Sequence, residues 1–212
     1  MNNCLTVKSI NLQFDNKLIF KNISFTASAG TITVLKGKNG SGKTSLLRCL
    51  CDIENHNNFP PDNILYNNIP VYKQKNKIPY IFGYLMQEPD KQICFPFIEE
   101  ELFFGAENLN KNTDIINQDY DFLTELFPFL KRTDIETNAL SFGQKKMLLF
   151  SGMVLKAPYI FLLDEPSVGL SDNFKNNLYN ILKLLLQKGK IIIIAEHNDY
   201  FDGIANGCIH LS

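Results

Sequence analysis

The clearest chemistry in the sequence lies in eight consecutive residues that fit the phosphate-binding pattern G-x-x-x-x-G-K-[ST], namely Gly37, Lys38, Asn39, Gly40, Ser41, Gly42, Lys43 and Thr44. The glycines let backbone N–H groups turn inward around phosphate oxygens, and the helix predicted over Ser45–Cys51 adds a partial positive charge at its N-terminus. We expect Lys43 to contact the β- and γ-phosphates of a nucleotide and Thr44 to offer its hydroxyl to Mg²⁺. The pattern therefore predicts a nucleoside triphosphate site, with Ser45 at its end.

An acidic pair, Asp164 and Glu165, follows the apolar run Tyr159–Leu163. A carboxylate at the end of a buried strand can hold the Mg²⁺ shell, and an adjacent one can polarise an attacking water as a general base. By itself such a pair is usually a solvated turn. Together with the phosphate loop, it favours a metal role for Asp164 and a catalytic role for Glu165.

Three short apolar runs are predicted to be buried parallel strands, namely Thr31–Lys36, Tyr159–Leu163 and Lys190–Ala195. The first leads into the phosphate loop, the second into the acidic pair, and the third into Glu196 and His197. Ligands of an open parallel sheet bind beyond the carboxyl ends of its strands, so we expect these loops to meet at one rim. Apolar residues at helical spacing over Asn173–Lys188 make the last two strands a βαβ unit.

The remaining segments are predicted to frame this sheet. Alternating apolar and polar residues over Leu5–Thr26 indicate antiparallel strands, whereas Ile98–Leu109 and Tyr120–Leu130 have helical character. We therefore predict a single α/β domain over residues 1–212. Its nucleotide-binding core comprises residues 1–86 and 150–212, and a helical subdomain occupies about residues 87–149.

The composition argues against several classes of protein. The formal net charge is −1, and no basic run is present that could neutralise the phosphates of a nucleic acid. The longest apolar stretch, Met147–Leu155, is far shorter than the roughly 18 residues that a membrane span needs. The N-terminus lacks a secretory signal, and the odd number of cysteines, without metal-ligand spacing, is typical of reduced thiols. We expect a cytoplasmic protein that binds no nucleic acid.

A further motif precedes the acidic pair, with the residues Leu140, Ser141, Phe142, Gly143 and Gln144. It is similar to the signature motif of the ATP-binding cassette (ABC) ATPases, and with the other motifs it makes nearly the whole chain resemble that family. The resemblance implies the P-loop ABC ATPase fold, with a mainly parallel core sheet, an N-terminal antiparallel β subdomain and an inserted helical subdomain. In the family, the signature of one subunit contacts the γ-phosphate of ATP held by another. The resemblance therefore implies a homodimer, or a heterodimer with a paralogue, that encloses two ATP molecules.

Three more positions match the family pattern. Gln87 corresponds to the glutamine loop that touches Mg²⁺ or water and links the site to a partner. His197 corresponds to the switch histidine that contacts the γ-phosphate. Phe14 lies where the family often has a tyrosine that stacks on adenine.

The sequence also departs from the family pattern at three positions. Phe142 replaces a second glycine of the signature, Met147 stands where a basic residue is common, and Ser171 stands where an aspartate usually meets the other subunit. These changes could slow dimer closure or alter the interface, but they leave the nucleotide-binding residues intact.

The segment from Gln87 to Asn108 resembles the ATPase subunits of energy-coupling factor and cobalt-type importers, which move vitamins or metal ions. By this resemblance, the Gln87–Phe104 region receives an integral membrane subunit, and the protein is peripheral on the cytoplasmic face of the cell membrane. Three alternatives stay open, namely a haem-exporter type ABC ATPase subunit, a soluble ABC ATPase of iron–sulfur cluster assembly, and a nucleotide-responsive binding module with little turnover.

Overall fold

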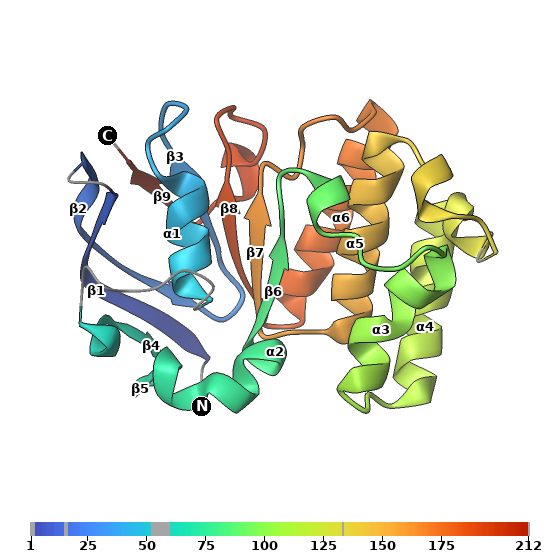
Figure 1. The fold of residues 1–212 in the computed structure, drawn as a ribbon, viewed down its shortest axis with the longest axis horizontal. Helices are drawn as coiled ribbons and strands as arrows, with labels where there is room; N and C mark the ends of the chain where they lie inside the picture. The colour runs from blue at the N-terminus through green and yellow to red at the C-terminus, as the bar shows by residue number, and fades with distance from the viewer. Residues whose placement is uncertain (1–2, 15–16, 52–59, 133, 212) are drawn as a thin grey trace.

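The computed structural model describes residues 3–14, 17–51, 60–132 and 134–211, and within these ranges the chain forms two sheets (Figure 1). The larger sheet has the order β6-β7-β8-β3-β9, and all its neighbouring strands are parallel. Its strands are β3 (Ile32–Lys36), β6 (Phe82–Leu85), β7 (Ile160–Asp164), β8 (Ile191–Ala195) and β9 (Gly207–His210). The three predicted parallel strands correspond to β3, β7 and β8, each within one residue at either end.

The smaller sheet is antiparallel and has the order β2-β1-β4-β5. It consists of β1 (Cys4–Phe14), β2 (Lys17–Ser28), β4 (Ile64–Tyr66) and β5 (Ile69–Pro70). The alternation over Leu5–Thr26 therefore predicted the pairing of β1 with β2 correctly.

The central strands β3, β7 and β8 are buried on both faces because they are apolar on both, whereas the edge strand β9 is largely exposed. In β8, Ile192 and Ile194 belong to one core cluster, while Ile191 and Ile193 belong to the other. Side chains alternate between the faces of a strand, so a continuous run of isoleucines supplies both cores at once. The predicted α/β class with a mainly parallel sheet is confirmed.

Helices cover the two faces of this sheet differently (Figure 1). On one face, α5 and α6 pack on the sheet, with α3 and α4 outside them, and on the other face α1 lies between the two sheets. The α-helices are α1 (Lys43–Leu50), α2 (Ile78–Ile81), α3 (Ile98–Asn108), α4 (Thr113–Leu126), α5 (Phe142–Lys156) and α6 (Asp172–Gln187). Short 3₁₀ turns span Pro61–Asn63, Val71–Lys77, Pro89–Lys91, Pro128–Lys131, Thr137–Ala139 and Asp202–Ile204.

The bounds of the second lobe helix differ from the prediction of Tyr120–Leu130. α4 begins at Thr113 because the side chain of Asn112 accepts hydrogen bonds from the N–H groups of Asp114 and Ile115, at 2.8 and 3.4 Å. It ends before Pro128, which starts a separate 3₁₀ turn. The division at residues 87–149 stays a prediction, and α5 runs across its second boundary.

Candidate functional site

The phosphate loop joins β3 to α1 and depends on glycine at its last turn. Gly42 has φ +91°, and a Cβ atom there would lie 2.5 Å from Cγ2 of Ile19 and 2.9 Å from Cδ1 of Phe20. A larger residue would meet both a strained backbone and a steric clash. The position therefore requires glycine for the loop to lie against β2.

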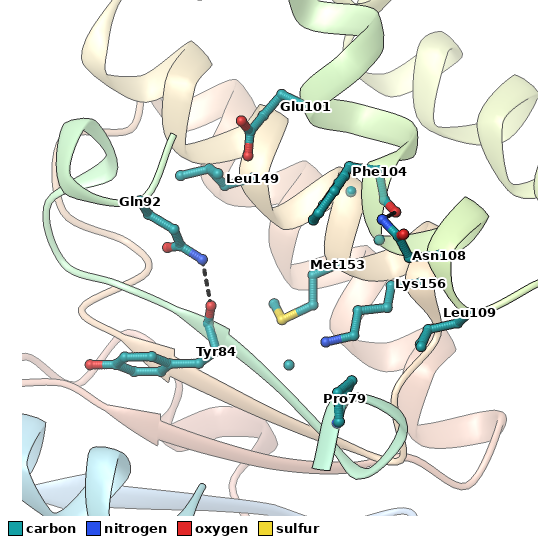
Figure 2. A pocket seen from close by; sticks show the side chains of 13 residues that line it. Pro79, Tyr84, Gln92, Glu101, Phe104, Asn108, Leu109, Leu149, Met153 and Lys156 are labelled. Carbon is teal, nitrogen blue, oxygen red and sulfur yellow. Dashed lines mark hydrogen bonds between the residues drawn. The ribbon is translucent and has the colours of Figure 1, made fainter. Parts of the chain in front are cut away.

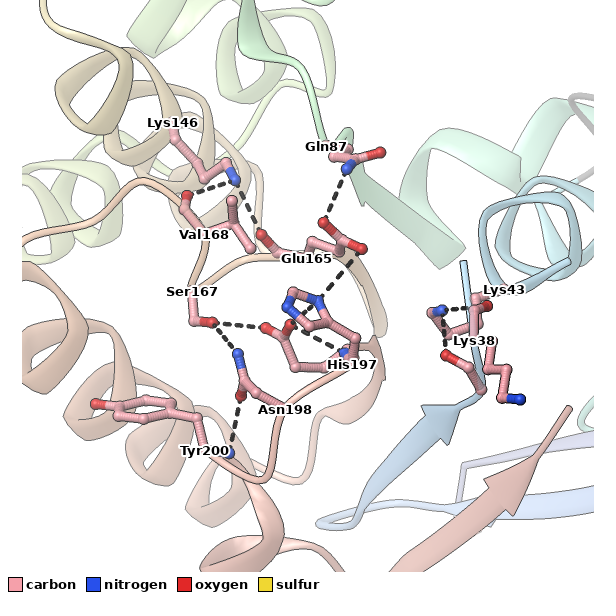
Figure 3. Close-up of polar contacts among 12 residues, drawn as sticks. Lys38, Lys43, Gln87, Lys146, Glu165, Ser167, Val168, His197, Asn198 and Tyr200 are labelled. Atoms are coloured by element: carbon pink, nitrogen blue, oxygen red, sulfur yellow. Dashed lines mark hydrogen bonds and ion pairs between the residues drawn. The ribbon is translucent and has the colours of Figure 1, made fainter. Parts of the chain in front are cut away.

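Lys43 is buried and folds back onto this loop (Figure 3). Its Nζ donates hydrogen bonds to the carbonyl oxygens of Gly37 at 2.7 Å and Lys38 at 3.2 Å. The hydroxyl of Ser41 is buried too, and it has no hydrogen-bond partner among the described residues. A buried hydroxyl without a partner is costly, and phosphate oxygens are the acceptors that this loop type binds.

A cavity of about 420 Å³ opens beside the loop. Nine of the predicted site residues line it, namely Asn39, Gly40, Gly42, Lys43, Thr44, Ser45, Gln87, Glu165 and His197. Ile19 also lines the cavity, and no sequence motif marks it, because it reaches the loop only through the position of β2. The sequence also predicts that Phe14 stacks on adenine. The side chain of Phe14 lies outside the described part of the structure, so this stays a prediction.

Glu165 lies between two other candidate catalytic residues at the wall of this cavity. Its Oε2 accepts a hydrogen bond from Nε2 of Gln87 at 2.8 Å, and its Oε1 lies 3.5 Å from Nδ1 of His197 (Figure 3). The backbone of Glu165 has a left-handed conformation, with φ +46°, and its N–H donates a hydrogen bond to the carbonyl oxygen of Ala195 at 2.9 Å. Three loops that follow β6, β7 and β8 thus bring an amide, a carboxylate and an imidazole together, as expected for one rim of a parallel sheet.

Asp164 is buried at the end of β7, and burial raises the pKa of its carboxyl group. Hydrogen bonds from Thr44 and Tyr84 oppose that rise, and the Tyr84 hydroxyl lies 3.3 Å from Oδ2. Thr44, Gln87 and Asp164 line a smaller adjoining cavity together. A hydroxyl, an amide oxygen and a carboxylate form an oxygen donor set that fits Mg²⁺.

The signature residues begin α5. The N–H of Gln144 donates to Oγ of Ser141 at 3.3 Å, and the N–H of Ser141 donates to Oε1 of Gln144 at 2.9 Å, which is a capping box. The described residues that line the nucleotide-sized cavity do not include Ser141, Phe142, Gly143 or Gln144. Within one copy of the chain, the signature and the phosphate loop are therefore separate sites.

The three departures from the family pattern have local structural explanations. The ring of Phe142 packs on Gly169, where an added Cβ would lie 2.4 Å from Cδ1 of the ring. Met147 is fully buried in the core, and Ser171 caps α6 by accepting a hydrogen bond from the N–H of Phe174 at 3.3 Å. Phe142 and Ser171 thus both act at the C-terminal end of the loop that follows Glu165, just before α6 begins.

Lys146 is a fully buried lysine that no sequence motif marks. Its Nζ donates to the carbonyl oxygens of Glu165 at 2.9 Å and Val168 at 3.0 Å (Figure 3). Burial lowers the pKa of Lys146 to about 8, and the negative charges of Glu196, Glu165 and Asp164 act in the opposite direction. The lysine lies one turn after Phe142 in an apolar helix, and only the fold brings it to the loop that carries Glu165.

The stretch that carries the phosphate loop, the glutamine, the signature and the acidic pair matches a known family of proteins. A family model described as ABC transporter matches residues 20–168. The chain belongs to the ABC transporter family. Among the ABC relatives, an energy-coupling factor transporter ATP-binding protein of Clostridium perfringens is 32% identical over 210 residues, which cover 92% of this chain and 69% of that protein. An energy-coupling factor transporter ATP-binding protein of Staphylococcus aureus is 27% identical over 201 residues, and the match covers 93% of this chain and 74% of that protein.

Solved ABC structures agree with this assignment. The structure of cbiO1 from Clostridium perfringens, described as part of the ABC transporter complex cbiONQ, superposes with a TM-score of 0.79 at 27% identity and covers 98% of this chain and 84% of that one. The chain is therefore an ATP-binding and ATP-hydrolysing subunit of an ABC transporter, and the haem-exporter and iron–sulfur alternatives are not favoured. In the described part of the chain, no helix is long and apolar enough to cross a membrane.

Proposed function

We propose that the subunit hydrolyses ATP with Glu165 as the general base and drives an importer of the energy-coupling factor type. The position of Glu165 carries the proposal, because it faces the cavity of the phosphate loop and is held between Gln87 and His197. A general base must be placed within hydrogen-bond reach of the proton that it removes, usually with a second group that orients it.

The chain's own residues account for the steps of hydrolysis. Backbone N–H groups of residues 39–45 hold the phosphates, and Lys43 exchanges its contacts with the carbonyls of Gly37 and Lys38 for phosphate oxygens. Glu165 takes a proton from water as the water oxygen bonds to the γ-phosphorus and the bond to the β-phosphate oxygen breaks, releasing ADP and phosphate. His197 contacts the γ-phosphate, where negative charge is held.

Thr44, Asp164 and Gln87 are the residues that would hold Mg²⁺. When bound there, the ion would supply positive charge that offsets the negative charge of the phosphates. Because Gln87 donates to Glu165 through its amide nitrogen, its amide oxygen is left to face the metal side. The same side chain can therefore bind the metal region and orient the base.

The signature motif requires a second ATPase subunit. Ser141 caps the N-terminus of α5, where N–H groups can bind an anion, yet it lies outside the cavity of its own chain. Two copies arranged head to tail, or one copy and a paralogue, place each signature on the γ-phosphate of the other subunit's ATP. The active assembly is in this proposal a dimer with two ATP molecules at its interface.

A groove of about 380 Å³ between β6 and the helices α3 and α5 fits the membrane subunit (Figure 2). The exposed ring of Phe104 and the apolar side chains Leu109, Leu149 and Met153 line it, with Glu101 and Lys156 among them. Gln92 fixes one wall by donating to the carbonyl of Tyr84 at 2.7 Å and accepting from the N–H of Met86 at 2.8 Å. A short amphipathic helix of a membrane protein is the occupant that such a mixed groove suits.

The importer subtype rests on the relatives named as energy-coupling factor transporter ATP-binding proteins. In this proposal the subunit works as a peripheral protein at the cytoplasmic face, where ATP is supplied, and a vitamin or a metal ion is selected by the membrane subunits.

Steady-state ATP hydrolysis of Glu165→Gln tests the catalytic assignment. We expect the rate to fall by roughly 10²- to 10⁴-fold, as for loss of a general base. Glu125→Gln, which changes an exposed carboxylate on α4, is the matched control and should hydrolyse ATP like the wild type. Equal rates for the wild type and Glu165→Gln would refute the assignment and would favour a binding module with little turnover.

A further inference from the structure

Glu196, the residue before the histidine of the site, has a fully buried carboxylate. Its Oε2 accepts a hydrogen bond from the Ser167 hydroxyl at 2.7 Å, and its Oε1 accepts one from the N–H of His197 at 3.1 Å. The same Oε1 lies 3.3 Å from Nδ1 of the His197 ring. This carboxylate therefore contacts both the histidine and the loop that follows Glu165.

The loop after Glu165 is held from two sides by buried charges (Figure 3). Lys146, also fully buried, binds the carbonyl oxygens of Glu165 and Val168, while Glu196 binds the hydroxyl of Ser167. The side-chain amide of Asn198 donates to the same hydroxyl at 3.3 Å. Burying a charge is costly unless it is paired and hydrogen-bonded, and here both charges are used to fix one short segment of backbone.

The surroundings of His197 determine which ring nitrogen carries its proton. Nδ1 lies 3.3 Å from the carboxylate of Glu196 and 3.5 Å from that of Glu165, and carboxylates only accept hydrogen bonds. Nδ1 must therefore be protonated, which leaves Nε2 for the nucleotide.

We propose that Glu196 is a positioning residue, which holds His197 with its proton on Nδ1 and couples it through Ser167 to the loop that carries Glu165. The inference rests on the proposed roles of Glu165 and His197 in hydrolysis. Glu196 itself is not among the described residues that line the cavity, so it acts through its neighbours and not on the nucleotide.

Separate measurements of ATP binding and turnover test this role. In Glu196→Gln, which keeps the shape of the side chain, and in Ser167→Ala, we expect kcat to fall by about tenfold or more, the loss typical of a charge-assisted hydrogen bond. The affinity for a fluorescent ATP analogue should change by less than about twofold, because neither residue lines the cavity. Glu125→Gln again serves as the control.

A spectroscopic readout separates positioning from a purely structural role. The chain has three histidines, at positions 56, 197 and 210, so ¹⁵N-histidine labelling gives three ring systems, and His197→Gln assigns one of them. Long-range ¹H–¹⁵N correlation should show the Nδ1-protonated form of His197 in the wild type. In Glu196→Leu, which removes the nearer of the two carboxylates and leaves Glu165 at 3.5 Å, the population should shift toward the Nε2-protonated form that is usual in water.

The outcomes distinguish this inference from the proposed function. If Glu165→Gln still hydrolyses ATP normally, the proposed function is wrong. If Glu165→Gln is inactive but Glu196→Gln and Ser167→Ala turn over like the wild type, the function stands and the inference fails. A wild-type His197 protonated on Nε2 would also overturn it, and should Glu196→Leu not fold, the kinetics of the other two variants decide the question.

Discussion

Gln87 donates a hydrogen bond of 2.8 Å to the carboxylate of Glu165, and the two residues follow neighbouring parallel strands, β6 and β7. Five residues after Gln87, Gln92 binds the backbone of β6 at the wall of the groove proposed for the membrane subunit. A displacement of this segment by an occupant of the groove would therefore move the amide that orients the general base.

Gln87→Ala should lower the hydrolysis rate by about tenfold, because it removes a hydrogen bond to an ionised carboxylate. It should also raise the Mg²⁺ concentration needed for half-maximal rate, since the amide oxygen is a proposed metal ligand. Hydrolysis measured over a Mg²⁺ titration checks both effects. Gln118→Ala, an exposed substitution on α4, is the control, and an unchanged Mg²⁺ dependence in Gln87→Ala would contradict the metal role.

Ser141→Ala should prevent ATP-dependent dimerisation. Glu165→Gln in saturating ATP and Mg²⁺ is expected to form a stable dimer, and adding Ser141→Ala should return it to a monomer in size-exclusion chromatography. Ser141 also caps α5, so Asn112→Ala, which removes the cap of α4, is the matched control for lost helix stability of about 1 kcal/mol. A dimer that persists in the double variant would argue against a signature contact with the other subunit's nucleotide.

Phe104→Glu should release the ATPase from its membrane partner. Phe104 is 52% exposed in the groove, and the centroid of its ring lies 4.7 Å from that of Phe95. A carboxylate at this position replaces an apolar contact surface with a negative charge. Purification from detergent-solubilised membranes should recover the membrane subunit with the wild type but not with Phe104→Glu. Ile115→Glu, at an exposed apolar position on α4 outside the groove, should keep the partner, and both variants should retain ATP binding.

Lys146→Met should destabilise the protein more at pH 9.5 than at pH 7. The pKa of Lys146 is lowered from 10.5 to about 8 in the folded state, so between these values the unfolded chain binds more protons and the free energy of unfolding rises with pH. Methionine does not titrate and lacks this contribution. The difference in the free energy of unfolding between the wild type and Lys146→Met should therefore grow by on the order of 1 kcal/mol from pH 7 to pH 9.5. Urea unfolding at the two pH values measures it, and a difference independent of pH would contradict a lysine that is buried in its charged form.

The sequence predicted the elements that depend on local pattern. The runs of β3, β7 and β8 were identifiable because a strand buried on both faces is apolar without interruption, and the phosphate loop because its glycines and lysine have fixed spacing. The start of α4 was placed too late, since the cap at Asn112 is a single hydrogen-bonding side chain that the apolar periodicity does not reveal.

The sequence by itself determined the family, the nucleotide and the order of the motifs along the chain. Only the tertiary structure decided which groups surround Glu165. Gln87 follows β6, His197 follows β8 and Lys146 lies on α5, so these three residues are distant in sequence and meet Glu165 only in the folded chain. The tertiary structure likewise showed that Glu196 is buried, since the exposure of a carboxylate depends on what packs over it and not on its neighbours in the chain. Short-range pattern specifies elements and loops, whereas hydrogen-bond partners and desolvation arise only when those elements pack together.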